Sequence, residues 1–169
     1  MAAIYSDLAG KVVLVTGGAS GIGEAIVRRF AEQKSIVVFF DIKAEEGARL
    51  ARELSSRSFG AHFMNVDLTD IAALRAGVAD ARKVHGPVNI LVNNAAHDER
   101  HPTEEMTPEY WDDRIAVNLK HQFFAAQAVL PDMKGANAGA IINFGSVSWM
   151  VGQGGMAAYT ASGYRDPGV

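Results

Sequence analysis

Short apolar runs alternate along this chain with longer segments in which apolar and polar residues are mixed. Near-continuous apolar runs separated by helical segments are typical of a parallel sheet that is buried on both faces. The pattern therefore predicts an α/β fold in three layers, formed by one domain over residues 1–169. The predicted strands cover residues 12–15, 36–40, 61–66, 88–92 and 139–144.

The mixed segments predict helices between these strands. Thr69 is expected to cap the third helix, and Thr107 the fourth, which has Pro108 at its first position. Asn118 interrupts the otherwise favourable pattern of the fourth helix. The predicted helices cover residues 24–31, 44–56, about 70–84 and 108–131.

A glycine-rich turn, Thr-Gly-Gly-Ala-Ser-Gly-Ile-Gly at residues 16–23, joins the first strand to the first helix. Glycines allow positive φ and close approach of a ligand, and a helix N-terminus favours a phosphate. Asp41 ends the second strand 18 residues after Gly23, near the spacing of about 20 expected for an acid that binds adenosine ribose. A turn without a ligand is the alternative. The full context favours a dinucleotide site in a Rossmann-type, doubly wound parallel sheet.

Asp41 favours NAD over NADP as the cofactor. Its carboxylate would hydrogen-bond a ribose 2′-hydroxyl and repel a 2′-phosphate, and no Arg or Lys lies within the turn. Lys43 weakens this argument, since it places a positive charge two residues further on.

The composition of the chain bears on its binding partners and on its cellular compartment. The formal net charge of −3 offers no basic footprint, so no nucleic-acid partner is expected. The chain has no cysteine, which excludes disulfides and thiolate ligands and favours a cytoplasmic setting. No apolar run approaches membrane-spanning length, and residues 1–7 lack the features of a signal peptide, so no membrane association is expected.

Ligands of such sheets bind at the carboxyl ends of the strands. The residue types that follow the five predicted strands are also common in turns, so any one of them could simply end its strand. Five groups of this kind at one edge of the sheet favour a ligand-binding site. They are residues 16–23, 41, 67, 93–97 and 145–148.

These residues resemble the short-chain dehydrogenase/reductase family from about Leu8 to Ser162. The turn matches its Thr-Gly-x-x-x-Gly-x-Gly pattern, and residues 93–96 resemble its Asn-Asn-Ala-Gly motif, with Ala96 in place of glycine. Three members of the family's catalytic tetrad match Asn118, Ser146 and Tyr159. More narrowly, several segments resemble sugar 1-dehydrogenases of the D-xylose type.

The resemblance implies an oxidoreductase that transfers a hydride between a nicotinamide and a small-molecule secondary alcohol or sugar hemiacetal. Tyr159 would be the base, Ser146 would hydrogen-bond the substrate oxygen, and Asn118 would position a helix carbonyl and a water. A homo-oligomer is implied if the full family domain is present. Cofactor contacts are expected from Gly17, Ser20, Gly21, Ile22, Gly23, Asp41, Asp67, Leu68, Asn94, Ala95 and Ala96.

A charged cluster follows the fourth predicted strand, from His97 to His101. The spacing of these two histidines suggests a metal site, but no helix is predicted there, so a solvated loop at the substrate mouth is favoured and no metal is expected. Trp149 fits a role in the pocket and a role covering the core equally well. Substrate contacts are expected from His97, Asp98, Ser148 and Trp149. The other histidines are expected to be structural or exposed: His62, His85 and His121.

The chain departs from the family after Tyr159. The family has a lysine four residues later, whereas this chain has Gly163, followed by an atypical tail, so that residues 163–169 differ from the family. An ordinary tyrosine has a pKa of about 10, so only roughly one in a thousand is phenolate at pH 7. Arg165 does not share a helical face with Tyr159. The sheet is expected to be truncated after the fifth strand, which becomes an edge, and a catalytically inert NAD-binding module is the alternative to an enzyme.

Overall fold

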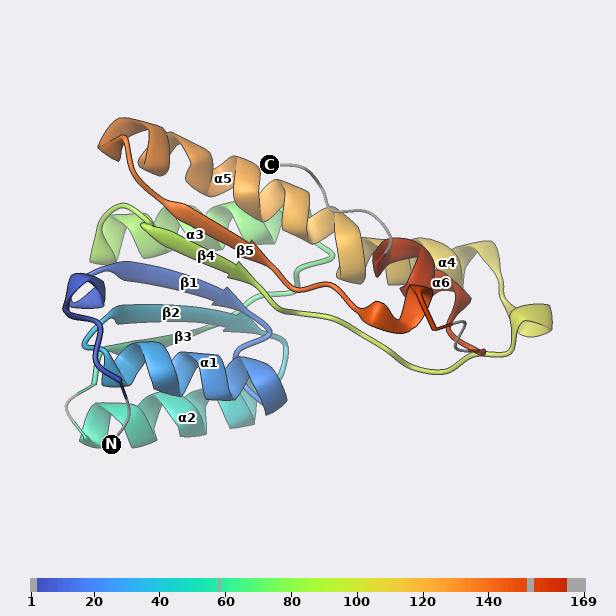
Figure 1. Ribbon diagram of the computed structural model, residues 1–169, viewed down its shortest axis with the longest axis horizontal. Helices are drawn as coiled ribbons and strands as arrows, with labels where there is room; N and C mark the ends of the chain where they lie inside the picture. Colours follow the sequence, from blue (N-terminus) through green and yellow to red (C-terminus); the bar gives the residue numbers. More distant parts are fainter. Residues whose placement is uncertain (1–2, 58, 152–153, 164–169) are drawn as a thin grey trace.

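Five strands form one sheet in the computed structural model, which describes residues 3–57, 59–151 and 154–163 (Figure 1). Their order is β3-β2-β1-β4-β5, and all neighbouring strands are parallel. The predicted Rossmann-type sheet is confirmed. The strands are β1 (Val12–Thr16), β2 (Ile36–Asp41), β3 (Ala61–Asn65), β4 (Ile90–Asn93) and β5 (Ala140–Asn143).

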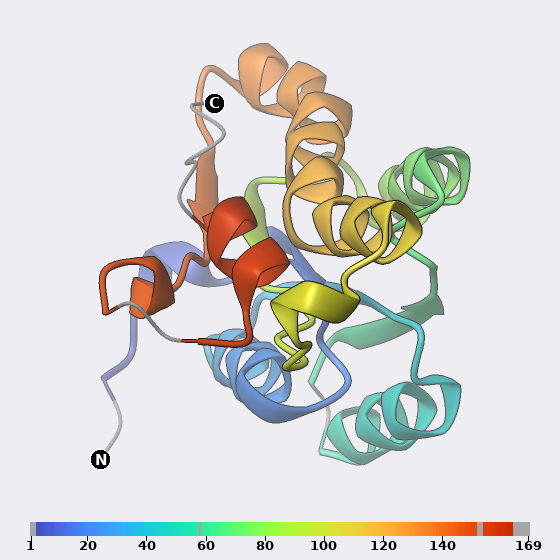
Figure 2. The ribbon, with the colours of Figure 1, turned by 90° about the vertical axis from the view of Figure 1, so that its right-hand side faces the viewer.

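Helices cover both faces of this sheet, as expected for a doubly wound fold. α1 and α2 lie on one face, and α3 and α5 lie on the other (Figure 2). The α-helices of the described residues are α1 (Gly21–Glu32), α2 (Ala44–Ser56), α3 (Ile71–His85), α4 (Pro108–Ile115), α5 (His121–Ala136) and α6 (Ala157–Gly163). Shorter helical turns are η1 (Ser6–Leu8), η2 (Thr103–Glu105), η3 (Ala116–Lys120) and η4 (Val147–Trp149).

Successive side chains of the central strands point to opposite faces of the sheet, so the hydrophobic core has one part on each face. On β1, Val13 and Val15 pack toward α1 and α2, while Leu14 packs toward α3 and α5. All five residues of β1 are buried. A strand of this kind needs an apolar residue at every position, which explains why its sequence shows no alternation.

β5 lies at the edge of the sheet and is much less buried than β1. It pairs with β4 from Ile90 opposite Ala140 to Asn93 opposite Asn143. Ile142 and, just beyond the strand, Phe144 are each 43% exposed. The prediction that the fifth strand forms an exposed edge is confirmed.

The predicted cap of α3 was wrong by one residue. Asp70 is the cap, and its Oδ1 accepts the N–H groups of Ala72 at 2.8 Å and Ala73 at 3.1 Å. The hydroxyl of Thr69 turns the other way and donates to Asp67. Both residue types are good caps, so only the local geometry distinguishes them.

The long helix predicted over residues 108–131 is divided in the structure. Thr107 does cap α4, accepting the N–H of Tyr110. A π-helical turn, η3, then interrupts the helix where Asn118 weakens the pattern. α5 continues through Pro131 and ends before Asn137, whose φ is 48°. Packing of α5 against the core outweighs the hydrogen bond lost at the proline.

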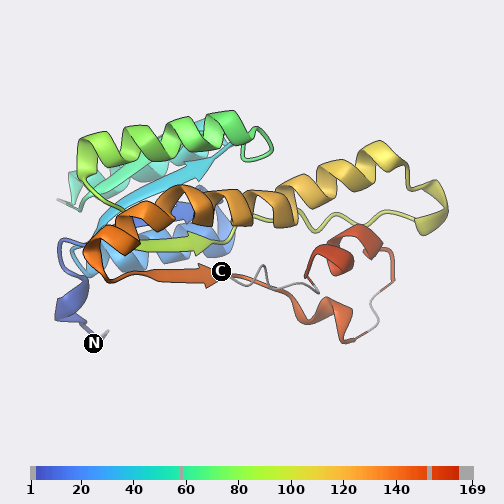
Figure 3. The ribbon, with the colours of Figure 1, turned by 90° about the horizontal axis from the view of Figure 1, so that it is seen from above.

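The carboxyl ends of the strands all face one side, and α4 and α6 lie beyond that edge (Figure 3). A ligand is expected at this edge of an open parallel sheet. Within the described ranges, no helix combines the length and apolarity required to cross a bilayer.

Candidate dinucleotide and active site

The glycine turn after β1 packs directly against the segment that follows β4. Gly17 has a φ of 67°, and a β-carbon there would lie 2.7 Å from the Cα of Ala95. A β-carbon at Gly23 would overlap the Gly17 carbonyl and the Asn94 side chain. Gly21 has a φ of 58°. Backbone packing and positive φ therefore require glycine in this turn.

The N-terminus of α1 is open above the turn. Ser20 is its cap residue, yet the Ser20 side chain makes no hydrogen bond to the first-turn amides. Ile22 is 66% exposed, and a β-carbon at Gly21 would meet no atom within 4 Å. Uncapped amides beside open space suit an anion, so the turn fits the pyrophosphate of a dinucleotide.

Asp41 lies at the end of β2, beside the turn, and is 8% exposed. Its Oδ2 accepts the N–H of Ala19 at 2.9 Å, and its Oδ1 accepts the N–H of Lys43 at 3.0 Å. The ammonium of Lys43 donates to Ser20 Oγ at 3.1 Å. Asp41 therefore stabilises the glycine turn through Ala19. The positively charged ammonium of Lys43 lies next to the same turn.

Two neighbouring residues predicted to contact the cofactor, Asp67 and Leu68, differ in exposure. Asp67 is exposed, and its Oδ1 accepts both the N–H and the hydroxyl of Thr69, at 2.9 and 2.7 Å. Leu68 is 6% exposed because its side chain belongs to the core beneath α3. Only the main chain of Leu68 is therefore left for a cofactor contact.

Thr16 connects the glycine turn to the end of β4. Its buried Oγ1 accepts the N–H groups of Asn94 and Ala95, each at 3.1 Å. The side chain of Asn94 donates to the carbonyls of Thr16 and Gly17, each at 3.0 Å. Ala96 is exposed just beyond. Asn94 and Ala95, predicted as cofactor contacts, also hold the two sides of the turn together.

Asn118 lies on η3 and is 6% exposed. Its Oδ1 accepts the N–H of His97 at 2.7 Å, and its Nδ2 donates to the His97 carbonyl at 3.1 Å. The Asn118 carbonyl accepts the side chain of Gln122 at 2.9 Å. The π turn therefore fixes the start of the loop after β4, while the His97 ring and Asp98 remain exposed.

Ser146 caps η4, where its Oγ accepts the N–H of Ser148 at 3.1 Å. Ser148 is 4% exposed, and its hydroxyl has no hydrogen-bond partner within the described part of the chain. Trp149 is 39% exposed. The three residues predicted on this segment thus lie on one short turn past β5, with only Ser148 buried.

Tyr159 lies half-buried on α6, which packs against η4, η3 and α4. Gly163 follows one helical turn later, and a β-carbon there would lie 3.9 Å from the Cβ of Ser146, an ordinary contact. A side chain at position 163 would therefore lie beside Ser146 without a clash. Arg165 lies outside the described residues.

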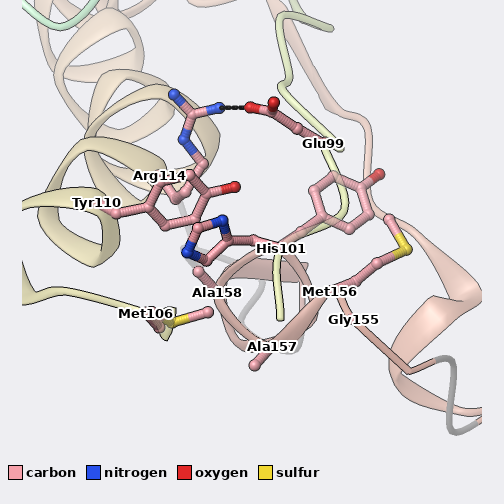
Figure 4. A pocket seen from close by; sticks show the side chains of 10 residues that line it. Glu99, His101, Met106, Tyr110, Arg114, Gly155, Met156, Ala157 and Ala158 are labelled. Atoms are coloured by element: carbon pink, nitrogen blue, oxygen red, sulfur yellow. Dashed lines mark ion pairs between the residues drawn. The ribbon is translucent and has the colours of Figure 1, made fainter. Parts of the chain in front are cut away.

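The side chains between α4, α6 and the loop after β4 line a tight hollow that leaves no room for a water molecule (Figure 4). Tyr159 is among its lining residues. The rings of His101 and Tyr110 stack with centroids 4.1 Å apart. Burial and the nearby carboxylates of Glu99 and Asp113 raise the pKa of Tyr110, which keeps its hydroxyl a hydrogen-bond donor.

Arg114 supplies the positive charge of this hollow. Its side chain is 11% exposed, lies 4.0 Å from the Glu99 carboxylate and also contacts His97 and Asp113. Burial lowers its pKa, and its Nε has no partner among the residues described. The sequence prediction missed Arg114. Its place four residues before Asn118, on the same helical face, is the signal that could have found it.

The histidine pair considered for a metal lies in different surroundings. His101 stacks on Tyr110, and His97 lies toward Glu99 and Arg114. Across residues 3–57, 59–151 and 154–163, no three His, Cys, Asp or Glu side chains gather as a metal site would require.

The sheet, the glycine turn and the polar residues at one edge define a dinucleotide-binding protein. Residues 11–163 match the family model described as short chain dehydrogenase, and the chain belongs to that family. Membership implies a nicotinamide cofactor, without deciding between NAD and NADP.

Two relatives are named as sugar dehydrogenases. D-xylose 1-dehydrogenase of Caulobacter vibrioides is 45% identical over 150 residues, which cover 89% of this chain and 59% of the relative. The probable galactose dehydrogenase GalD of Rhizobium meliloti is 42% identical over 159 residues, which cover 94% of this chain and 62% of the relative. This chain therefore spans about three fifths of the length of both relatives.

Solved structures agree with the fold. A metagenomic short-chain oxidoreductase in complex with NADP superimposes with a TM-score of 0.89 at 35% identity, covering 94% of this chain and 72% of that one. The apo form of LigO from Sphingobium sp. strain SYK-6 also gives a TM-score of 0.89, at 32% identity, covering 95% of this chain and 60% of LigO.

Proposed function

We propose that this chain supplies the dinucleotide site and the reacting side chains of an NAD-dependent oxidoreductase acting on a sugar hemiacetal or a secondary alcohol. One observation carries the proposal. α6 packs against both η4 and η3, so the segments bearing Tyr159, Ser146 and Asn118 meet beyond the carboxyl edge of the sheet. These are the residue types that the family reaction needs.

Each side chain has a role in moving or holding a proton. Tyr159 takes the proton of the substrate hydroxyl, and Ser146 donates a hydrogen bond to the same oxygen. Asn118 holds the loop after β4 through both atoms of its side-chain amide. The nicotinamide, when bound, accepts the hydride.

The charged and polar side chains beside Tyr159 support a polyhydroxylated substrate. A guanidinium and a carboxylate, from Arg114 and Glu99, face each other there, with the hydroxyl of Tyr110 nearby. Charged donors and acceptors make stronger hydrogen bonds to hydroxyl groups than neutral ones do. The sugar substrates named for the two relatives agree with this chemistry. His97, Asp98, Ser148 and Trp149 complete the proposed substrate side.

NAD is the proposed cofactor because Asp41 ends β2 with its carboxylate at the turn. A 2′-phosphate placed there would be repelled by the carboxylate of Asp41, and this repulsion would be poorly screened because Asp41 is buried. Lys43 provides the opposing attraction, and its contact with Ser20 holds it close to the turn. We expect NADH to bind more tightly than NADPH. Lys43→Ala should widen that difference.

A catalytically inert dinucleotide-binding module is the second candidate. Gly163 favours it, because no cation stands one turn after Tyr159 to stabilise a phenolate. Position 163 has room for a side chain beside Ser146. The two candidates can therefore be separated by adding the missing charge at that position.

The experiment compares the chain with its Gly163→Lys and Gly163→Met variants, which add side chains of similar length with and without charge. NADH binding is measured by fluorescence, and turnover by NADH formation from D-xylose, D-galactose and L-arabinose at high pH. We expect all three proteins to bind NADH, and Gly163→Lys to raise turnover at least about 100-fold over Gly163→Met.

Absence of dinucleotide binding in all three proteins would reject the proposed function. Binding without turnover in Gly163→Lys would leave the inert module as the correct description.

A further inference from the structure

His121 is a titratable side chain with no solvent exposure, and the reaction described above does not use it. It is the first residue of α5, directly after the π turn that carries Asn118. Its Nε2 lies 3.4 Å from the Oγ1 of Thr16, which is also fully buried. A polar contact thus joins the last residue of β1 to the helix that follows Asn118.

The direction of this hydrogen bond follows from the other partners of Thr16. The N–H groups of Asn94 and Ala95 both donate to Thr16 Oγ1. A hydroxyl has two lone pairs and one hydrogen. Both lone pairs are occupied, so the hydrogen points to His121 Nε2, which must be unprotonated to accept it. The ring proton therefore resides on Nδ1.

Burial favours the same neutral state of His121. It lowers the pKa from 6.5 to about 4, and a main-chain contact with Val117 offsets only part of the effect. Nδ1 has no hydrogen bond of normal geometry within the described residues, so the Val117 contact is weak. The orientation of the neutral ring is therefore set mainly by its hydrogen bond with Thr16.

We propose that His121 is a positioning residue, whose neutral ring holds the Thr16 hydroxyl so that its lone pairs fix Asn94 and Ala95 against the glycine turn. Through its place after η3, the same ring ties the dinucleotide turn to the segment that bears Asn118. This inference rests on the proposed function, in that the site being organised is the dinucleotide site.

An apolar side chain could fill the same space but could not accept the hydroxyl hydrogen. The hydroxyl hydrogen of Thr16 would then be buried without an acceptor, and the hydroxyl would no longer be held with both lone pairs toward the two amide donors. Glutamine can present a terminal oxygen near the position of Nε2, so it should preserve the acceptor. The proposal therefore predicts different outcomes for His121→Leu and His121→Gln.

The first test is spectroscopic and observes the wild-type chain, with His121→Gln used only to assign the signal. In ¹⁵N-histidine spectra of the wild-type chain, we expect one of the five histidines to be a fixed Nδ1–H tautomer. The His121→Gln spectrum assigns that signal by its absence. An Nε2–H tautomer or a freely exchanging ring for His121 would overturn the proposal.

The second test measures NADH affinity. We expect His121→Leu to weaken binding about tenfold. Thr16→Val should weaken it more, because it also removes the acceptor of two amides, and the double variant should be no weaker than Thr16→Val. His121→Gln should bind within about twofold of wild type. His85→Gln, at the end of α3, is the matched control and should not change binding.

Additive losses in the double variant, or wild-type affinity in His121→Leu, would contradict the proposal. If the wild-type chain binds neither NADH nor NADPH, the proposed function fails on its own. In that case the tautomer and the amide resonances of Asn94 and Ala95 decide whether His121 organises the turn: they should shift in His121→Leu and stay in place in His121→Gln.

Discussion

The dinucleotide end and the substrate end of this site are built differently. At the dinucleotide end, buried main-chain groups meet buried side chains: Thr16 has no exposure, and Gly17 and Gly23 lie where a β-carbon would collide. At the substrate end, the loop after β4 faces solvent, with the side chains of His97 48% and Glu99 59% exposed. The first end is fixed by glycine packing and buried side chains, and the second depends largely on exposed side chains.

This difference predicts how each end responds to substitution. A buried turn with satisfied donors and acceptors is part of the fold, so changes there affect stability and cofactor binding together. Exposed polar side chains contribute little to stability, so changes there should affect the substrate alone. A variant that behaves otherwise would show that the two ends are coupled.

The largest effect is expected for Gly23→Ala. The added β-carbon overlaps the Gly17 carbonyl and the Asn94 side chain, and backbone atoms cannot move aside cheaply. We expect the free energy of unfolding to fall by about 3 kcal/mol or more, with loss of NADH binding. Urea unfolding and NADH fluorescence measure the two effects.

The same substitution in an open place is the control. Gly135 lies within α5, and a β-carbon there meets no atom within 4 Å. Gly135→Ala should stabilise the chain by about 0.5–1 kcal/mol through helix propensity. If Gly23→Ala unfolds at the wild-type urea concentration, backbone packing does not fix the dinucleotide end.

The next effect is the dependence of stability on pH. The pKa of His121 is about 4 in the folded chain against an ordinary 6.5, so the unfolded chain binds more protons between these values. Stability due to this residue is therefore complete above pH 6.5 and is lost as pH falls toward 4. Between about pH 7 and pH 4.5 we expect a loss of about 2–3 kcal/mol.

Comparison with His121→Gln isolates this contribution. Burial also lowers the pKa values of His62 and His85, and both remain in the variant, so their effect cancels. The wild-type chain should lose more stability than His121→Gln over the same pH interval. Equal slopes in urea unfolding would mean that His121 titrates normally.

At the substrate end, we expect Arg114→Met to act on the sugar alone. The Arg114 side chain is only 11% exposed, but methionine keeps its apolar stem and Glu99 stays in contact with water, so the free energy of unfolding should change by no more than about 1–2 kcal/mol. In the Gly163→Lys chain, KM for the sugar should rise about tenfold or more while NADH affinity stays within about twofold. Arg29→Met, on the far surface of α1, is the control. A large loss of NADH affinity would break the separation of the two ends.

The sequence predicted the dinucleotide end better than the substrate end, for a physical reason. β1 is apolar from Val12 to Val15 because both of its faces are buried, and the glycines of the turn are marked by the positive φ of Gly17 and Gly21. Both signals are local. Arg114 and His121 have their roles only because the π turn sets which way each faces, and that orientation depends on contacts with residues far away in sequence.

The smallest effect concerns the cap of α3, close in sequence to Asp67, a proposed cofactor contact. Asp70→Ala removes the acceptor of two first-turn amides and should destabilise the chain by about 1 kcal/mol. Thr69→Ala removes only a surface hydrogen bond to Asp67 and should change stability by no more than about 0.5 kcal/mol. Freed from Thr69, the Asp67 carboxylate should still allow NADH binding within about twofold of wild type. A larger binding change in Thr69→Ala than in Asp70→Ala would mean that the orientation of Asp67, an exposed side chain, matters at the dinucleotide end. Exposed as well as buried side chains would then define that end of the site.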